Sequence, residues 1–171
     1  MSNIITFNGQ YEDDSVEMTN GLMDVFIDAM LVCELQLAKS ESEKMLMSFL
    51  SIKQQGIVGR GTVGFDIVEM PWRRDSFDAD KKFILRVIQN AKEHDNWDVL
   101  EYEPARSHLM YALDGFEKLI NRMSIDDVDE QNYQEWIEDF PVVSRCNKHK
   151  IIMYKPFGCK ICNEIGSYYK K

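Results

Sequence analysis

Two closely spaced pairs of residues near the end of the sequence carry side chains that bind metal ions. Cys146 and His149 form a Cys-x-x-His pair, and after nine residues Cys159 and Cys162 form a Cys-x-x-Cys pair. Three thiolates and one imidazole are the soft ligands of a closed tetrahedral zinc site, and the spacing within each pair is the one that such sites use. Because a closed site keeps no position open for water, the pattern predicts a structural Zn²⁺, with iron as the alternative that ligand type leaves open.

A turn-forming sequence precedes the second pair, since Pro156 and Gly158 lie just before Cys159. The order Cys-x-x-His followed by Gly-Cys-x-x-Cys resembles the zinc knuckles of treble-clef and zinc-ribbon modules, in particular endonuclease VII-like treble clefs, over about 17 residues. The resemblance implies metal binding by the two pairs. It implies no catalysis, because the nine residues after Cys162 are too few for the helix with histidine and asparagine that such a nuclease requires.

Charge is divided unevenly along the chain. The net charge is −9, but residues 144–171 carry +6, so that the other 143 residues carry −15. A strongly negative body repels phosphate backbones, whereas it attracts a basic protein and accelerates their encounter. We therefore expect a basic protein as the partner, and nucleic acid could bind only through residues 144–171.

Length and composition indicate one globular body with an appendage. The chain has 171 residues, of which 44% are hydrophobic and 29% charged, close to the average of folded domains. We expect an acidic helical body over residues 1–141 and a zinc-binding module over residues 142–171. The sequence has neither a run of about 18 apolar residues nor a signal peptide at its start, which predicts a cytoplasmic protein that does not enter membranes. Cys33 lies in an apolar helical segment and is expected to be a core thiol.

Apolar residues at helical spacing predict a mainly α fold. The expected helices begin near Thr19, Ser42, Ser76 and Pro104, and a fifth, acidic helix covers roughly residues 125–140. Whether the first two helices form one continuous helix is left open by the sequence. The fold class expected is a helical bundle-like body of four to five helices with a short glycine-rich β element, plus the small C-terminal zinc-binding module.

The glycine-rich segment lies between the second and third expected helices. Gly59 to Gly64 has the Gly-x-Gly-x-x-Gly spacing of a dinucleotide-binding turn, but a phosphate cradle needs a strand before it and a helix after it. Here a helix precedes the glycines and an expected strand, Phe65–Val68, follows them, which favours a structural loop with one or two short strands. Ile4–Phe7 is expected to form an edge strand or to stay irregular.

Catalytic patterns are weak in this sequence. His94 or His108 could join Asp66, Glu69 or Asp98 in an acid/base or metal site if the fold brought them together, but histidines near helix ends more often contact solvent or backbone. The sequence contains neither a His-Glu-x-x-His motif nor a Gly-x-Ser-x-Gly motif. We therefore expect a protein that is not an enzyme.

The acidic helix and one tryptophan segment each admit two interpretations. Glu135, Trp136, Glu138 and Asp139 either form a solvated face with the ring packed inward or a docking surface for a basic protein. Trp72 is either a core residue or an exposed anchor for a partner. The function expected is that of an intracellular protein-binding protein of the inhibitor, immunity or regulatory type. The alternative is a nucleic-acid-associated regulator that binds through its basic zinc module.

Overall fold

The computed structural model describes residues 3–9, 15–34, 37–55, 64–140, 143–153, 158–159 and 161–162. The described part contains the five helices α1 (Asn20–Cys33), α2 (Glu41–Gln55), α3 (Phe77–Lys92), α4 (Arg106–Arg122) and α5 (Glu130–Asp139). Its strands are β1 (Asn3–Thr6), β2 (Val16–Met18), β3 (Phe65–Asp66), β4 (Ser144–Arg145) and β5 (Ile152–Met153). Short 3₁₀ helices cover Ile67–Glu69 (η1), Trp97–Val99 (η2) and Ile125–Asp127 (η3). The mainly α fold class is confirmed.

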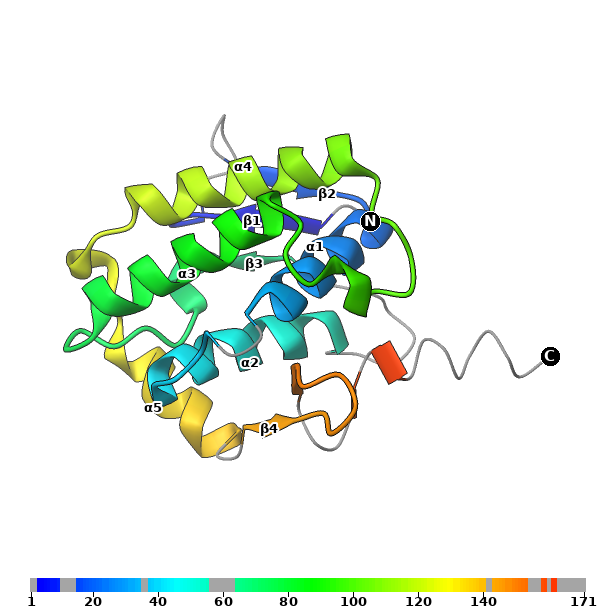
Figure 1. Cartoon of the computed structure of the whole chain (residues 1–171). Helices are drawn as coiled ribbons and strands as arrows, with labels where there is room; N and C mark the ends of the chain where they lie inside the picture. The colour runs from blue at the N-terminus through cyan, green and yellow to red at the C-terminus, as the bar shows by residue number, and fades with distance from the viewer. Residues whose placement is uncertain are drawn as a thin grey trace.

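Helix α1 is the centre of the body, and it contacts α2, α3 and α4 (Figure 1). The helix begins where the sequence predicts, because the Thr19 hydroxyl accepts a hydrogen bond of 3.2 Å from the Leu22 N–H. Every residue from Phe26 to Cys33 is buried, so the C-terminal half of this helix is enclosed on all sides rather than along one stripe. Cys33 is fully buried, which confirms that it is a core thiol.

Helices α1 and α2 are separate, which answers the question that the sequence leaves open. Ser40 and Glu43 form a reciprocal cap at the start of α2. The Ser40 hydroxyl accepts from the Glu43 N–H at 3.1 Å, and the Glu43 carboxylate accepts from the Ser40 N–H at 2.9 Å. In a continuous helix these two N–H groups would donate to carbonyls of the preceding turn. Here the two side chains accept from them instead, and a new helix starts at this point.

The fifth helix is shorter than the sequence predicts. Ser124 and Asp127 cap the short helix η3, and the chain then leaves helical geometry at Val128 and Asp129. The Asp129 carboxylate accepts from the Gln131 N–H at 2.9 Å and starts α5. Two aspartates that cap helices therefore divide the expected helix over residues 125–140 into two pieces.

A three-stranded sheet packs beside the helices with the strand order β2-β1-β3 (Figure 1). β1 is antiparallel to β2, with Ile5 opposite Val16, and parallel to β3, with Ile5 opposite Phe65. The expectation of an edge strand or an irregular segment at Ile4–Phe7 is therefore wrong, because β1 has a partner on both sides. The Gly59–Gly64 motif lies outside the described residues except for Gly64, where a Cβ atom would collide with the Ile4 backbone. Gly64 thus has a structural role as the point where two backbones meet.

Trp72 is a core residue, and its assignment as an exposed partner anchor is wrong. Its side chain is 1% exposed, and the indole N–H donates a 2.8 Å hydrogen bond to the Ile67 carbonyl. The ring packs edge-on against Phe77, with the ring centroids 5.7 Å apart. Because its one polar atom has a backbone partner, this large ring can be buried without an unsatisfied donor.

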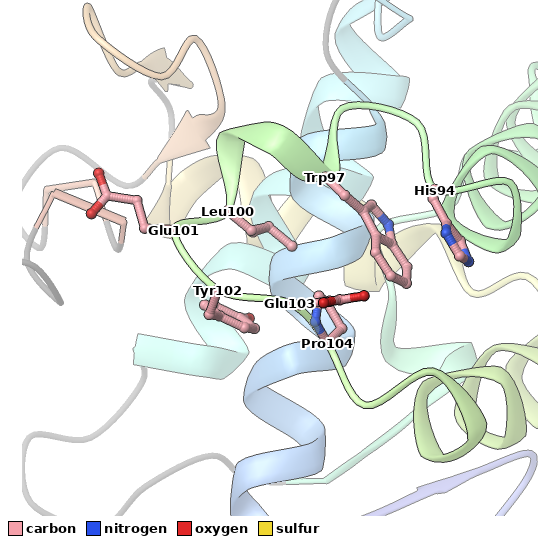
Figure 2. Close-up of a pocket in the computed structure, with 7 residues that line it drawn as sticks. All are labelled: His94, Trp97, Leu100, Glu101, Tyr102, Glu103 and Pro104. Carbon is pink, nitrogen blue, oxygen red and sulfur yellow. The ribbon is translucent and has the colours of Figure 1, made fainter.

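The connection between α3 and α4 contains η2 and lies against the C-terminal end of α1 (Figure 2). Helix α3 ends at Lys92, and the chain turns through left-handed backbone at His94 (φ 66°) and Asn96 (φ 57°). Pro104 is buried and lies just before α4 rather than in its first turn. This connection therefore has a defined irregular conformation between two helices.

Strands β4 and β5 form an antiparallel hairpin that packs on α2 (Figure 1). Ile151 and Ile152 of the hairpin belong to the same buried apolar cluster as the helices. The division between residues 141 and 142 stays a prediction, and the hairpin is in direct contact with the body. None of the helices in the described part is long and apolar enough to cross a membrane.

Candidate metal centre

The β4–β5 hairpin positions the first pair of candidate ligands. The Cys146 N–H donates to the Ile151 carbonyl at 2.9 Å, and the Lys150 N–H donates to the Cys146 carbonyl at 2.8 Å. Lys150 takes a left-handed conformation (φ 62°) that closes the turn. This turn places the His149 N–H 3.3 Å from the Cys146 sulfur, to which it donates. The thiol is thus held by the backbone of its own turn.

The second pair approaches from the segment that follows the hairpin. Gly158 has a φ of 74°, a left-handed conformation that glycine adopts without a steric cost. Ile161 and Cys162 have helical backbone, and Ile161 is buried with Cys159 in the same apolar cluster. Gly158 therefore has the backbone conformation that a tight turn before the second pair needs, while Pro156 lies outside the described residues.

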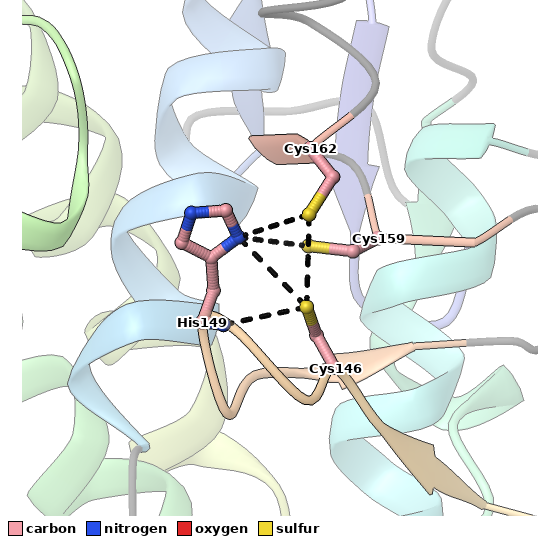
Figure 3. Close-up of side chains that lie close together, drawn as sticks. All are labelled: Cys146, His149, Cys159 and Cys162. Carbon is pink, nitrogen blue, oxygen red and sulfur yellow. Dashed lines mark hydrogen bonds between the residues drawn. The ribbon is translucent and has the colours of Figure 1, made fainter.

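The four candidate ligand atoms gather at one point, as Figure 3 shows. His149 Nδ1 lies 3.3 Å from the Cys162 sulfur, 3.4 Å from the Cys159 sulfur and 3.8 Å from the Cys146 sulfur. The Cys146 and Cys162 sulfurs are 3.7 Å apart, and all four atoms lie within 4.8 Å of one another. Zinc bonds of about 2.3 Å to sulfur and about 2.0 Å to nitrogen place tetrahedral ligands roughly 3.5–3.8 Å apart. The spacing fits a tetrahedral metal ion.

The centre is closed on most sides. Cys146 and Cys159 are each 5% exposed and His149 is 9% exposed, whereas Cys162 is the most exposed of the four. No fifth protein ligand is needed, since three thiolates and one imidazole complete a structural zinc site. The arrangement can hold a metal ion, and a cavity of about 490 Å³ borders it at His149.

Burial and local hydrogen bonds set the proton affinities of the ligands in the metal-free centre. Burial raises the pKa of Cys159 to about 12 and also raises the pKa of Cys162. At Cys146 burial acts in the same direction, but hydrogen bonds, led by the one from the His149 N–H, outweigh it and hold the pKa of this thiol below its usual value. Burial lowers the pKa of His149, and the Lys148 charge adds to this effect. The imidazole is therefore neutral, as a metal ligand must be.

Arg145 attaches the hairpin to the end of α1. Its guanidinium binds the Glu34 carboxylate through two hydrogen bonds, Nη1 to Oε1 at 2.7 Å and Nη2 to Oε2 at 3.2 Å. Nη1 also donates to the Lys150 carbonyl at 2.9 Å, which ties the same side chain to the end of the turn that carries Cys146 and His149. Burial raises the pKa of Glu34, and the hydrogen bonds and charge of Arg145 oppose this rise.

The acidic residues of α5 are exposed, and the tryptophan among them packs inward. Glu135, Glu138 and Asp139 lie on the surface. Trp136 is half-buried: its ring lies against Phe49 with centroids 5.1 Å apart, and its indole N–H donates to the Ser48 hydroxyl at 3.1 Å. The docking role of these four residues stays a prediction, in which the acids rather than the ring would face a partner.

The candidate acid/base residues lie in three places: Asp66 and Glu69 at β3 and η1, His94 and Asp98 in the connection before α4, and His108 in α4. The Asp66 carboxylate caps backbone beside β3, where it accepts from the N–H groups of Asn8, Gly9 and Val68. His94 stacks on Trp97 in the connection before α4, with ring centroids 3.9 Å apart. His108 is exposed in the first turn of α4. These positions do not build a catalytic arrangement within the part of the chain that the structure describes.

Two functional features are missing from the sequence-based predictions. The first is the Glu34–Arg145 ion pair, for which the sequence signal was a lone acid directly after an apolar helix. The second is the run of five acids without a basic residue from Glu93 to Glu103, which the structure places beside the hairpin. Of the basic residues in segment 144–171, Lys148 and Lys150 are exposed on the turn, and Lys155, Lys160, Lys170 and Lys171 lie outside the described residues.

Comparison with protein-family models, curated proteins and solved structures gave no match.

Proposed function

We propose that the protein binds one Zn²⁺ through Cys146, His149, Cys159 and Cys162, and that this ion has a structural role. The observation that carries the proposal is the spacing of the four soft ligand atoms, which fits the edges of a tetrahedron around zinc. Thiolates favour zinc over magnesium or calcium, and a closed set of four protein ligands favours structure over catalysis.

The proposed ion adds a direct link between two segments that also contact the apolar core through Ile151, Ile152 and Ile161. It links the Cys159–Cys162 turn to the hairpin, and Arg145 links the hairpin to α1. A short hairpin of two-residue strands is too small to be stable alone, so that metal coordination contributes directly to its folding. Loss of the ion should therefore loosen the C-terminal part before the helical body.

We further propose that the protein is not an enzyme and acts by binding a basic protein, as an inhibitor, immunity or regulatory protein. The negative charge of the body supports this proposal, and so do the exposed carboxylates of Glu135, Glu138 and Asp139, none of which forms an ion pair with a described residue. Uncompensated surface acids accelerate encounter with a basic partner. Exposed Lys148 and Lys150 support the second candidate, contact with nucleic acid through the metal module.

Native mass spectrometry of the purified chain tests the metal site. We expect one zinc per chain, lost on chelation, and no bound zinc in the Cys159→Ala variant. Cys33→Ala is the matched control, since it removes a thiol that lies outside the cluster. A wild-type chain that takes up no zinc when refolded with the metal would contradict the proposal.

Charge reversal tests the two binding proposals against each other. The triple variant Glu135→Lys, Glu138→Lys and Asp139→Lys should lose a basic partner captured by the wild type, and the capture should weaken with salt. Reversal of the three exposed acids Glu17, Asp78 and Asp126, which changes the net charge by the same amount, is the control. If Lys148→Ala with Lys150→Ala instead removes bound nucleic acid and lowers the salt dependence of binding, the second candidate is correct.

A further inference from the structure

A pocket of about 570 Å³ lies in the connection between α3 and α4 and is lined by residues of the segment 94–104 (Figure 2). We call it the 94–104 pocket. Trp97 and Tyr102 supply aromatic walls, while Leu100 and Pro104 are buried. Glu101 and Glu103 complete the lining with two carboxylates. The pocket therefore combines flat aromatic surface with negative charge.

Both aromatic walls are held in place by other side chains. The Trp97 ring stacks on His94, with centroids 3.9 Å apart and an angle of 11° between the planes. The Tyr102 hydroxyl donates a 2.8 Å hydrogen bond to the carboxylate of Asp28, which is buried in α1. Rings whose positions are fixed before binding lose little conformational entropy when a ligand stacks on them.

The backbone of the pocket is anchored to the C-terminal end of α1. The Asn96 side-chain amide donates to the Val32 carbonyl at 3.2 Å, and the Cys33 thiol donates to the Asp95 carbonyl at 2.9 Å. These two hydrogen bonds hold the left-handed turn at His94 and Asn96 against a buried helix. The pocket thus has a rigid base although it is formed by a connection without long secondary structure.

The surroundings of the pocket are acidic. Residues 93–103 contain five acids and neither lysine nor arginine, and all five acids are exposed. Figure 2 shows the Glu103 carboxylate directed toward the Trp97 ring, whereas Glu101 extends toward the hairpin, where it lines a second cavity of about 490 Å³. Neither Glu101 nor Glu103 forms an ion pair with a residue of the described ranges. Within the described part of the chain, their charge is therefore not paired with a basic side chain.

We propose that the 94–104 pocket binds an arginine side chain of a protein partner. A guanidinium is planar and can stack on Trp97 or Tyr102 while it donates two hydrogen bonds to the Glu103 carboxylate. Lysine has neither property, because its ammonium is a compact and strongly hydrated charge. This proposal rests on the basic partner of the proposed function, and it depends neither on zinc nor on α5.

A titration of the full ¹⁵N-labelled chain with Nα-acetyl-arginine methylamide tests the pocket by NMR. We expect saturable shifts of the Trp97 indole N–H signal, with the indole signals of Trp72 and Trp136 as internal references. The uncharged isostere Nα-acetyl-citrulline methylamide should bind at least about tenfold more weakly, because it cannot form the charged pair. Glu103→Gln should weaken arginine binding by about threefold, and Glu138→Gln on α5 should leave it unchanged.

Three outcomes would overturn the pocket proposal: no saturable shift at Trp97, an equal response to the citrulline compound, or unchanged arginine binding in Glu103→Gln. If any of these results is found and the α5 triple variant also loses partner capture, only the pocket proposal is contradicted. The proposal of a basic partner then still stands. Conversely, if Glu103→Gln captures less of the basic partner while the α5 triple variant captures as much as the wild type, the partner binds at the pocket. A preserved NMR spectrum of Glu103→Gln excludes misfolding as the cause.

Discussion

Arg145 and Glu34 form a bidentate ion pair although they lie 111 positions apart in the sequence. The Glu34 side chain is completely buried, whereas Arg145 is 32% exposed. A buried carboxylate is costly unless it is paired and hydrogen-bonded, and here one guanidinium supplies both the charge and the two donors. The pair therefore fixes where the hairpin meets the helical body.

Removal of the guanidinium should destabilise the protein more than removal of the carboxylate charge. Arg145→Ala leaves Glu34 buried without a partner, and we expect the free energy of unfolding to fall by about 2–3 kcal/mol, near the lower end for such pairs because water can reach Arg145. Glu34→Gln keeps a hydrogen-bond acceptor and should cost less. Urea denaturation measures both values.

Lys148→Ala is the matched control for this comparison, since it removes a neighbouring positive charge that is exposed. It should change the free energy of unfolding by less than about 0.5 kcal/mol. Equal effects of Arg145→Ala and Lys148→Ala would show that the ion pair adds nothing to stability.

Zinc uptake should release protons and should fail in acid. Burial keeps Cys159, with a pKa of about 12, and Cys162, with a raised pKa, protonated at neutral pH in the metal-free centre. Both thiols must lose their protons to bind zinc, so that protons compete with the metal and affinity falls as the pH falls. Calorimetric titration with zinc in buffers of different ionisation enthalpy should show release of at least two protons per chain at neutral pH. Binding without proton release would be incompatible with thiolate ligands.

Cys33 should resist alkylation as long as the protein is folded. Burial and, to a lesser extent, the Asp95 charge raise the pKa of this thiol to about 12, and the nearby Trp97 side chain only partly opposes the rise. We expect iodoacetamide to modify no cysteine in the zinc-loaded chain. After chelation it should modify the three ligand cysteines, and only after unfolding should it modify all four. Mass spectrometry counts the adducts. Modification of Cys33 in the folded chain would contradict its burial.

The same pKa shift makes stability depend on alkaline pH. In the unfolded chain the Cys33 thiol ionises near its ordinary value of 9.0, while the folded chain keeps the proton up to about pH 12. The folded state thus binds more protons in this range, and stability should fall as the pH rises above 9. Cys33→Ala should make the free energy of unfolding depend less steeply on pH. Urea denaturation of both chains at pH 8 and pH 10 measures the difference.

Gly115 should tolerate no side chain, although it lies in the middle of α4. A Cβ atom at this position would be 2.6 Å from Cγ2 of Val16, which is buried in β2. Alanine in a helix normally stabilises by about 1 kcal/mol relative to glycine. Here we expect Gly115→Ala to destabilise the protein by about 1–2 kcal/mol because the sheet must move away.

A double variant identifies the cause of this loss. Val16→Ala removes the methyl groups that Gly115→Ala would meet, so that the two substitutions together should cost less than the sum of the separate effects. Gly21→Ala is the control in α1, where no atom lies within 4 Å of the added Cβ, and it should be neutral or stabilising. If Gly115→Ala also stabilised the protein, the close contact between α4 and β2 would be absent in solution.

Local features were predictable from the sequence. The ligand pairs at Cys146 and Cys159, the Thr19 cap and the apolar stripes of α3 and α4 each depend on residues a few positions apart. Such patterns directly reflect the geometry of a turn or a helix. The expected acidic helix was correct in place and wrong in length, because the capping roles of Asp127 and Asp129 compete with helical backbone bonding.

Pairings between distant segments were not predictable. The central position of β1 depends on Phe65, which lies 60 positions after its partner Ile5, and a four-residue strand carries too little pattern to indicate two neighbours. Burial of Trp72 depends in the same way on where η1 and α3 pack around it. The acidic connection and the metal module come together only because both rest on α1, a helix from another part of the chain.

Three consecutive residues at the end of α1 together hold two different parts of this assembly, the connection before α4 and the hairpin. Val32 accepts from Asn96, Cys33 donates to Asp95, and Glu34 binds Arg145. Helix ends usually fray, and their amide protons then exchange with solvent through small local openings. Here fraying would break contacts to two separate segments at once. The last turn of α1 should therefore exchange its amide protons as slowly as the middle of the helix.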